Sequence, residues 1–302
     1  MDYQLPSSLA RLKGTVGVWT ANIESLPADH SHEAALAVEA AGFSALWIAE
    51  AWGRESFTNA SLLLSRTTTL TVATGIANIF GRDPVAAAAA SRTLNAAYND
   101  RFVLGLGVSH RPLVERLRGH TYATPVAAMR DYLAAMDAAP MFAPEASQRY
   151  ARVVAALGPK MLALAAAAAD GVHPYLVTPA HTAQARALVG EKFIGVEQAV
   201  VLGQNRDEFL RRAHAHLEIY TGLENYRNSW ARLGFDESDF VRGGSDRLCD
   251  ALVVHGDEQT VAQRVQEHRI AGADHVCLQL LGEDITTVPF DEWRRLGASI
   301  NT

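Results

Sequence analysis

The sequence is poor in cysteine and has no long uninterrupted hydrophobic run. Its two cysteines, Cys249 and Cys277, are not spaced as metal ligands, so we expect reduced thiols that pack as small apolar groups and no metal site. No apolar stretch is long enough to cross a bilayer, and residues 1–11 lack the apolar core of a signal peptide. These absences predict a cytoplasmic protein that does not interact with membranes.

The sequence also lacks an excess of positive charge. It carries 27 Lys and Arg against 33 Asp and Glu, which gives a net charge of −6 at pH 7. A general nucleic-acid binder needs a basic surface to replace the counterions of the phosphate backbone. We therefore exclude nucleic acid as a partner and expect a small-molecule substrate.

Several common catalytic and nucleotide-binding motifs are missing. There is no P-loop and no G-x-S-x-G nucleophile elbow, and the closest match to a dinucleotide fingerprint, G-L-G-V-S-H from Gly105, lacks its third glycine. The chain is therefore not expected to be a P-loop nucleotidase, a serine hydrolase of that type or a classical dinucleotide-dependent dehydrogenase.

What the sequence does contain is a regular alternation of short apolar runs and helical stretches. The apolar runs are continuous rather than alternating, which is typical of parallel strands covered on both faces. We predict strands at 14–20, 45–49, 70–75, 102–107, 153–157, 172–177, 198–202 and 275–281.

Eight strand–helix units in 302 residues predict a single-domain α/β protein, a (β/α)8 TIM barrel over residues 1–302. Residues 205–254 are longer than one crossover needs and contain several helical patterns, so we expect a helical insertion there, between strands 7 and 8. A doubly wound open sheet is the alternative fold, and in both folds the chemistry lies at the carboxyl ends of the strands.

One stretch, residues 152–171, predicts a strand, a glycine turn and a helix. Gly158 ends the apolar run, Pro159 suits the first position of a helix, and Lys160 starts a long helical Ala/Leu/Met run. The free N–H groups and positive dipole end of such a helix attract anions, and Lys160 adds a full charge. The alternative interpretation is an ordinary strand-to-helix turn with a solvated lysine.

Candidate site residues are those that follow the predicted strands. His110 and His173 come at strand ends and are candidates for a functional role, whereas His214 and His216 lie in a polar helix and are expected to be solvated. Glycines at such a rim allow the backbone to approach a flat or phosphorylated ligand. The full set of strand-end candidates is Trp19, Glu50, Trp52, Gly75 to Asn78, Gly107 to His110, Leu157 to Lys160 and His173.

Nearly the whole chain resembles the luciferase-like monooxygenase superfamily, and within it the deazaflavin (coenzyme F420)-dependent oxidoreductases. The motifs that carry this resemblance are A-L-W-I-A-E-A-W-G-R from Ala45, T-G-I-A-N-I-F-G-R-D-P from Thr74, R-F-V-L-G-L-G-V-S-H from Arg101, A-A-L-G-P-K-M-L from Ala155, A-D-G-V-H-P-Y-L from Ala169 and G-A-D-H-V-C-L-Q from Gly272.

The resemblance implies a deazaflavin bound across the carboxyl ends of the barrel strands. It implies that Gly75-Ile76 forms a bulge with a non-proline cis peptide behind the ring, and that Glu50 faces the ring system. The cofactor-binding residues that it implies are Glu50, Gly75, Ile76, Asn78, Gly107, Val108 and Ser109 around the ring and ribityl chain, and Ala156, Gly158, Pro159 and Lys160 around the phosphate.

The chain departs from the family members that oxidise sugar phosphates. Those carry a histidine where Ala51 stands and an acidic residue where Val108 stands, so sugar-phosphate oxidation is not expected. Glu50 and His110 are the candidates for proton handling, and Trp19, Trp52 and His173 are candidates for the substrate pocket.

The expected function is hydride transfer between F420 and an unidentified organic substrate. An FMN-dependent monooxygenase is the alternative on the same fold, and a non-catalytic flavin-binding barrel is a third. The resemblance also implies a homodimer formed through helices near the alanine run that starts at Ala86.

Overall fold

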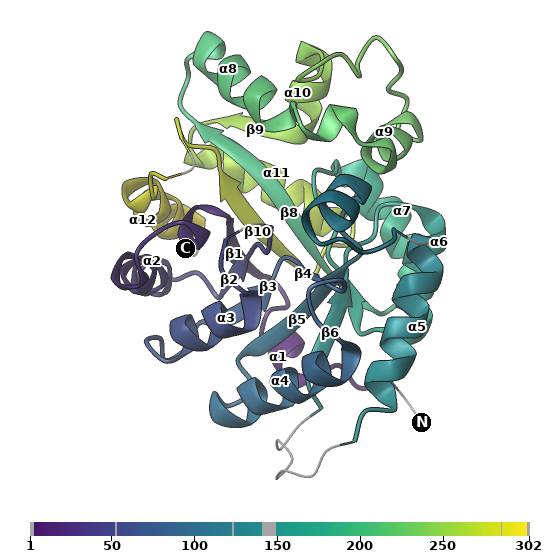
Figure 1. Cartoon of the computed structure of the whole chain (residues 1–302). Helices are drawn as coiled ribbons and strands as arrows, with labels where there is room; N and C mark the ends of the chain where they lie inside the picture. The colour runs from purple at the N-terminus through teal and green to yellow at the C-terminus, as the bar shows by residue number, and fades with distance from the viewer. Residues whose placement is uncertain (1–2, 52, 123, 141–148, 285, 301–302) are drawn as a thin grey trace.

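Runs of apolar residues form a closed barrel of parallel strands at the centre of the molecule (Figure 1). The computed structural model describes residues 3–51, 53–122, 124–140, 149–284 and 286–300. Eight strands of this part of the chain make the barrel, because β10 pairs with both β1 and β8 and so joins the two ends of the sheet. In pairing order they are β1 (Thr15–Thr20), β2 (Ala45–Ile48), β3 (Thr71–Thr74), β5 (Phe102–Gly107), β6 (Ala151–Val154), β7 (Gly171–Val172), β8 (Phe193–Leu202) and β10 (His275–Leu280).

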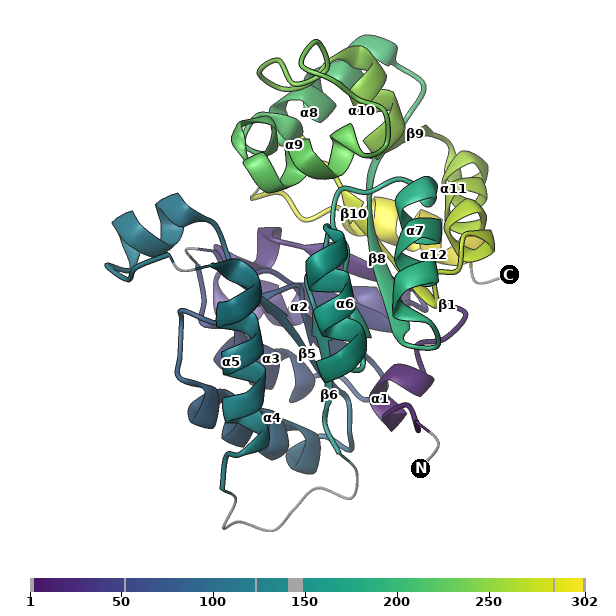
Figure 2. The same cartoon turned by 90° about the vertical axis from the view of Figure 1, so that its right-hand side faces the viewer.

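Helices follow the strands and surround the barrel, which confirms the predicted TIM-barrel fold (Figures 1 and 2). Successive helices of this outer layer contact one another, as α4 contacts α5 and α12 contacts both α11 and α2. The outer helices are α2 (Ala28–Ala40), α3 (Ser56–Leu64), α4 (Pro84–Ala97), α5 (Pro125–Asp137), α6 (Pro159–Ala168), α7 (Pro179–Val189), α11 (Glu258–Ile270) and α12 (Phe290–Ile300). None of the helices in the described ranges is both long and apolar enough to span a membrane.

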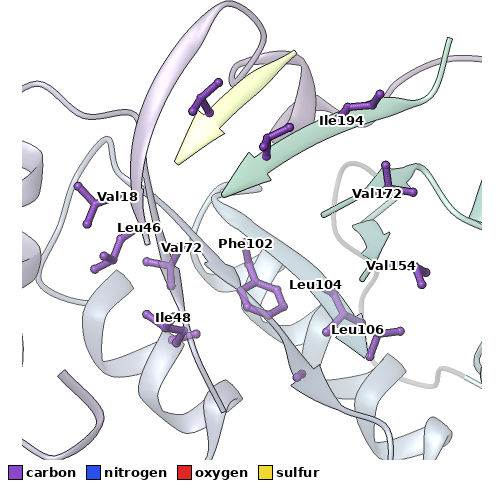
Figure 3. Packing of buried hydrophobic residues seen from close by; sticks show 14 of the residues in the cluster. Val18, Leu46, Ile48, Val72, Phe102, Leu104, Leu106, Val154, Val172 and Ile194 are labelled. Atoms are coloured by element: carbon purple, nitrogen blue, oxygen red, sulfur yellow. The ribbon is translucent and has the colours of Figure 1, made fainter. Parts of the chain in front are cut away.

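Each barrel strand is buried on both faces, which explains its continuous apolar sequence. Side chains such as Leu46, Val72 and Leu104 point outward into the layer between strands and helices (Figure 3). Alternate side chains, among them Trp47 and Phe193, fill the barrel interior. Burying one such side chain contributes about 1.5–3 kcal/mol relative to leaving it in water, so the two layers together hold the fold.

A short helix, α1 (Ser7–Ala10), covers the amino end of the barrel. Its Leu9, together with Leu12 just beyond it, is fully buried against the interior side chains of the barrel. The amino end is therefore closed by apolar packing, and the opposite end is the one where the strand-to-helix loops gather.

The helical insertion lies between β8 and α11, at the carboxyl end of the barrel. In both views its helices form a group of their own above the strands (Figures 1 and 2). It consists of α8 (Arg206–Leu217), the short η3 (Tyr220–Gly222), α9 (Glu224–Ala231) and α10 (Asp246–Leu252), and it ends in β9 (Val253–Gly256), which pairs with the last residues of β8. Phe209, Trp230 and Leu248 are buried in an apolar core of its own.

Three strands predicted from the sequence have the wrong bounds. The strand expected at 153–157 is Ala151–Val154, so it ends four residues before Gly158. The strand expected at 172–177 ends at Val172, because Pro174 has no N–H for the ladder and Leu176 adopts a left-handed conformation with φ 53°. The strand expected at 198–202 begins at Phe193 instead. Gly195 and Glu197 interrupt the apolar pattern there, yet both lie on barrel strand β8 and are buried.

Smaller elements were also missed by the sequence patterns. They are the two-residue strand β4 (Ala77–Asn78), which pairs with β5, the strand β9 inside the insertion, the 3-10 turn η1 (Asn22–Glu24) and the π-helix η2 (Leu113–Leu117). Each is too short for a periodic pattern to be recognised.

The contact between α12 and α2 gives a test of the outer layer. Replacing a helical glycine with alanine usually stabilises a helix, by roughly 1 kcal/mol. At Gly297, however, an added Cβ would collide with the backbone carbonyl oxygen of Ala41. We expect Gly297→Ala to lower the free energy of unfolding by about 2 kcal/mol, measured by urea denaturation.

The matched control is Gly222→Ala, because a Cβ at Gly222 would meet no atom within 4 Å. We expect that variant to unfold at the wild-type urea concentration. Equal or greater stability of Gly297→Ala would show that the two helices are not in close contact.

Candidate active site

The carboxyl ends of the strands bring most of the predicted site residues to one mouth of the barrel. Trp19 is on β1, Glu50 follows β2, Gly75 and Ile76 follow β3, and the residues after β5 and β6 complete the rim. Trp52 lies outside the described residues. The closed parallel barrel therefore gathers residues as far apart in the chain as Trp19 and Lys160, as expected for a TIM barrel.

A backbone bulge after β3 forms part of this rim. The peptide bond between Gly75 and Ile76 is cis, which confirms the expectation from the sequence. The Trp19 indole Nε1 donates a hydrogen bond of 2.9 Å to the Gly75 carbonyl oxygen. A Cβ at Gly75 would lie 2.5 Å from that same Nε1, and one at Gly107 would collide with the Ile76 side chain. Glycine is thus required at both positions for this arrangement.

Glu50 is the centre of a hydrogen-bond network that holds the bulge. Its two carboxylate oxygens accept from the backbone N–H of Ser56 (3.1 Å) and of Asn78 (2.7 Å), and from both terminal nitrogens of Arg82. Two carboxylate oxygens offer about four acceptor positions, and these four donors occupy them. The Glu50 side chain is 5% exposed, so the pair is a buried structural ion pair.

A polar hollow opens beside this ion pair. It has a volume of about 360 Å³ and is lined by Glu50, Ala51, Gly53, Arg54, Glu55, Gly81, Arg82, Leu117 and Arg118. The Arg82 guanidinium also pairs with Glu55 at 2.8 Å, so it is neutralised from two sides. This part of the rim is polar but largely self-compensated.

The start of α6 provides an anion site on the other side of the mouth. Gly158 occupies the N-cap position without any side-chain cap, and Pro159 is the first helical residue, as predicted. Lys160 is exposed, and within the described residues its ammonium has no hydrogen-bond or ion-pair partner. Ala156, by contrast, is buried beneath the loop.

A second cation near this helix start was not predicted. Arg232, which follows α9 of the insertion, donates a hydrogen bond of 3.0 Å to the carbonyl oxygen of Leu157. Its guanidinium would lie 3.7 Å from a Cβ at Gly158. The positive end of the helix, the Lys160 N–H and the cation of Arg232 therefore lie together, and the exposed Lys160 side chain starts from the same turn.

The loop after β5 carries the predicted residues Val108, Ser109 and His110. All three are half-buried, and Ser109 has a positive φ of 56°. Burial lowers the pKa of the His110 imidazole below its usual value, so the ring is neutral at pH 7. Within the described part of the chain this ring forms no hydrogen bond.

His173 is packed below the mouth, and its place in the substrate pocket stays a prediction. His173 is 2% exposed, stacks on Trp47 with ring centroids 4.3 Å apart, and has its Nδ1 2.8 Å from the carbonyl oxygen of Gly195. Because a carbonyl oxygen only accepts, Nδ1 carries the proton. Burial lowers the pKa of His173 to about 4. Its Nε2 has no hydrogen-bond partner among the described residues and would lie 3.2 Å from a Cβ at Gly75, so the ring lies directly beneath the bulge.

Tyrosines that the sequence analysis missed form one wall of the mouth. The Tyr220 hydroxyl donates to the Tyr175 hydroxyl at 3.2 Å, and the Tyr175 hydroxyl donates to Gln279 Oε1 at 2.8 Å. The ring of Tyr226 lies 4.9 Å from that of Tyr220. Tyr220 and Tyr226 belong to the insertion and Tyr175 follows β7, so only the folded chain brings them together.

The histidines expected to be solvated are engaged instead. His216 is half-buried, with its Nε2 3.5 Å from the Tyr175 hydroxyl, and burial lowers its pKa to about 4. His214 contacts the carbonyl oxygen of Gly243 at 3.1 Å and Asp246 at 3.2 Å. The expectation is therefore wrong for both, because the polar face of α8 packs against the rest of the insertion and the barrel mouth.

Glu197 is a buried acid beneath the tyrosines, and no sequence signal marked it. One of its carboxyl oxygens accepts from the backbone N–H of Leu176 at 2.9 Å, and the other has no partner. Burial raises the pKa of this carboxyl group to about 8, so Glu197 is protonated at pH 7. No cluster of three or more His, Cys, Asp or Glu that could hold a metal occurs among the described residues.

Comparisons with known proteins agree with this geometry. Residues 15–275 match the profile of the luciferase-like monooxygenase family. The chain is 34% identical over 118 residues to a protein of Mycobacterium tuberculosis that carries the name of a coenzyme F420-dependent oxidoreductase, and this covers 39% of the chain and 33% of the relative. It is 26% identical over 246 residues to a 5,10-methylenetetrahydromethanopterin reductase of Archaeoglobus fulgidus, covering 75% of the chain and 66% of the relative. The chain thus spans from a third to just under two thirds of the length of these relatives.

Solved structures with low sequence identity share the fold. An F420-dependent secondary alcohol dehydrogenase in complex with an F420–acetone adduct superposes with a TM-score of 0.74 at 13% identity, covering 96% of this chain and 98% of that one. The oxygenating constituent of a type II Baeyer–Villiger monooxygenase of Pseudomonas putida, in complex with FMN, gives a TM-score of 0.70 at 14% identity, covering 94% and 95%.

The raised pKa of Glu197 gives a testable dependence of stability on pH. The folded protein keeps a proton on Glu197 that the unfolded chain loses above about pH 4.5. The contribution of Glu197 to stability therefore falls as pH rises from about 4.5 to 8, by at most about 1.4 kcal/mol for each pH unit. Glu197→Gln keeps an acceptor for the Leu176 N–H and has no proton to lose.

We expect the Gln variant to gain stability over the wild type progressively from pH 5 to pH 8, measured by urea denaturation at each pH. Buried histidines titrate in the same window but in both proteins alike, so the difference isolates Glu197. Glu283→Gln, at a residue whose side chain is 75% exposed, is the control and should give a constant difference. A constant difference for Glu197→Gln as well would show that Glu197 is ionised in the folded protein.

Proposed function

Because the chain belongs to the luciferase-like monooxygenase family, we propose that it is an oxidoreductase that transfers hydride between the deazaflavin coenzyme F420 and an organic substrate. The observation that carries this proposal is the anion site at the start of α6, which shares the barrel mouth with the cis Gly75–Ile76 bulge. A phosphate-bearing planar cofactor needs both an anion site and a firm apolar surface.

The residues present suit the phosphate of such a cofactor. The backbone N–H of Lys160, the Lys160 ammonium and the Arg232 guanidinium offer donors and positive charge without an opposing carboxylate among their described contacts. Charge-assisted hydrogen bonds of this kind are about twice as strong as neutral ones. This donor set would hold the phosphate.

The rim between β3 and β5 suits the ring of the cofactor. Half-buried Ile76 and Val108 offer apolar contact at the mouth, and Gly107 lets Ile76 pack closely. When bound, the deazaflavin supplies hydride transfer, a chemistry that no protein side chain performs. The protein contributes binding, orientation and the handling of the accompanying proton.

Glu50 has a positioning role in this proposal. Glu50 is a candidate for proton handling from its sequence position. In the structure, however, Ser56, Asn78 and Arg82 occupy all of its hydrogen-bond acceptor positions. Releasing a buried carboxylate from such partners is costly. Glu50 therefore fixes the bulge, and His110 is the predicted group that keeps free hydrogen-bonding capacity.

Support for F420 over FMN comes from the relatives. The relative from Mycobacterium tuberculosis carries the name of a coenzyme F420-dependent oxidoreductase, and the one from Archaeoglobus fulgidus that of a methylenetetrahydromethanopterin reductase. The FMN-containing neighbour shares the fold at low identity. Both cofactors carry a phosphate, so the anion site serves either. The homodimer implied by the sequence resemblance stays a prediction.

Titration with both cofactors tests the proposal. We expect F420 to quench the protein's tryptophan fluorescence with a dissociation constant at least about tenfold lower than that of FMN, a preference of about 1.4 kcal/mol. Equal binding, or tighter binding of FMN, would favour the monooxygenase alternative.

Lys160→Ala tests the phosphate site. A charge-assisted contact to phosphate contributes about 1.5–3 kcal/mol, so the variant should bind F420 at least about tenfold more weakly at low salt. Lys13→Ala is the matched control, because Lys13 is a half-exposed lysine whose partner, Asp274, lies 3.3 Å away at the amino end of the barrel. The same dissociation constant for Lys160→Ala and the wild type would remove Lys160 from the cofactor site.

A further inference from the structure

An arc of aromatic rings crosses the barrel mouth and begins beside the bulge. It starts at Trp19 on β1, whose ring lies 5.1 Å from that of Tyr175. Tyr175 lies 6.5 Å from Tyr226, and Tyr226 lies 5.9 Å from His110 after β5. The Trp19 indole also donates to the Gly75 carbonyl oxygen, and β3 pairs with β5, so both ends of the arc lie beside the bulge.

The insertion fixes the position of the arc. Trp230 on α9 is fully buried, and its indole Nε1 donates to the Leu176 carbonyl oxygen at 3.1 Å. Tyr226 is one helical turn before Trp230, with ring centroids 5.7 Å apart. The hydrogen bond from Trp230 to Leu176 also holds the loop that carries Tyr175, the residue before Leu176. The insertion is thus anchored to the barrel at the point where it presents Tyr226.

Two polar groups in the arc lack hydrogen-bond partners. Tyr226 is 7% exposed, yet its hydroxyl forms no hydrogen bond with any described residue. The His110 imidazole likewise forms no hydrogen bond with any residue in the described ranges. The neighbouring Tyr220 and Tyr175 hydroxyls, by contrast, are bonded to each other. Neither group is among the fully buried atoms without a partner, so both still reach solvent, and a polar atom of a ligand at the mouth can replace water there and bond them.

The arc carries no ionised side chain at neutral pH. Burial lowers the pKa of His110, lowers that of His216 to about 4 and raises that of Tyr226 well above its usual value. A charged ligand group would find no countercharge there and would lose its hydration. An uncharged oxygen, which both accepts and donates hydrogen bonds, suits a phenol and a neutral imidazole.

We propose that His110 and Tyr226 bind the oxygen atom of an uncharged carbonyl or alcohol substrate and exchange the proton that accompanies hydride transfer. This inference rests on the proposed function, since it takes the hydride from F420. It assigns a catalytic residue, Tyr226, to the insertion.

The atoms of the step balance as follows. In the reductive direction the substrate carbon gains a hydride with its electron pair from reduced F420, the C=O π bond breaks, and the oxygen gains a proton from the Tyr226 hydroxyl. The tyrosinate recovers a proton from solvent through half-buried His110. In the oxidative direction the same groups run the reverse steps and F420 is reduced.

The test uses Tyr226→Phe, which keeps the buried ring and removes only the hydroxyl. The probes are benzaldehyde, cyclohexanone and cyclohexenone as uncharged carbonyl compounds, and 4-formylbenzoate as the charged counterpart of benzaldehyde. Oxidation of reduced F420 is followed by absorbance with wild-type protein, Tyr226→Phe and His110→Gln. Cofactor dissociation constants are measured in parallel.

We expect the wild type to reduce at least one uncharged probe and to discriminate against 4-formylbenzoate. Tyr226→Phe should lower kcat at least about 100-fold, the usual effect of losing an acid–base or oxyanion-stabilising group, with an unchanged dissociation constant for F420. His110→Gln should also lower kcat. Tyr98→Phe is the control, because the Tyr98 hydroxyl is bonded to Ser61 at 3.0 Å in the outer helices, and it should keep wild-type kinetics.

The outcomes separate this inference from the proposed function. Failure of the wild type to bind F420 overturns the proposed function. If F420 binds but no uncharged probe is reduced, or Tyr226→Phe retains wild-type kcat, the substrate assignment is overturned and the cofactor assignment remains. Weaker F420 binding by Tyr226→Phe would place the hydroxyl on the cofactor and would also overturn the substrate role.

Discussion

The pairing of β10 with both β1 and β8 is the contact on which the whole active site depends. It closes the sheet, and closure brings the carboxyl ends of all the parallel strands to one mouth. Without it, Trp19 on β1 and Tyr175 after β7 would lie far apart at the edge of an open sheet. With it, the two rings stand 5.1 Å apart, and Tyr226 of the insertion lies 5.9 Å from His110 after β5.

Inside the closed barrel, the buried charged pair of Glu50 and Arg82 fixes the geometry of the rim and takes no part in the reaction. The Glu50–Arg82 pair is almost fully buried, and both members are bound to neighbours on every side. Such a pair adds little net stability compared with apolar packing, but it becomes very unfavourable when one partner moves. It therefore restrains the rim between β2 and β4 to one geometry. A cofactor ring bound against this rim would therefore contact a rigid surface.

Much of the fold could be predicted from the sequence, because strands buried on both faces leave continuous apolar runs. The pattern failed at β7 and β8, where Pro174 ends a strand early and the buried Gly195 and Glu197 interrupt another. The cofactor side of the site was also predictable, since Gly158, Pro159 and Lys160 adjoin in sequence. The tyrosine wall was not, because Tyr175 and Tyr226 are separated by 51 residues and meet only through the insertion. Nothing local distinguishes those tyrosines from ordinary core residues.

The two sides of the mouth differ in charge, and this difference follows from solvation. Lys160 and Arg232 are exposed, so they can keep their charge at little cost and attract an anion from solution. Tyr226, His110 and Glu197 are more deeply placed, where burial favours their neutral forms. A cofactor with a charged end and a neutral ring would bind with its charge at the wet side and its ring in the neutral region. The hydride would then be exchanged in the part of the mouth that is poorer in water. Among the described residues of the arc, only Tyr226 and His110 have free hydrogen-bonding capacity there. The proton is therefore assigned to these two residues, because all acceptor positions of the Glu50 carboxylate are already occupied.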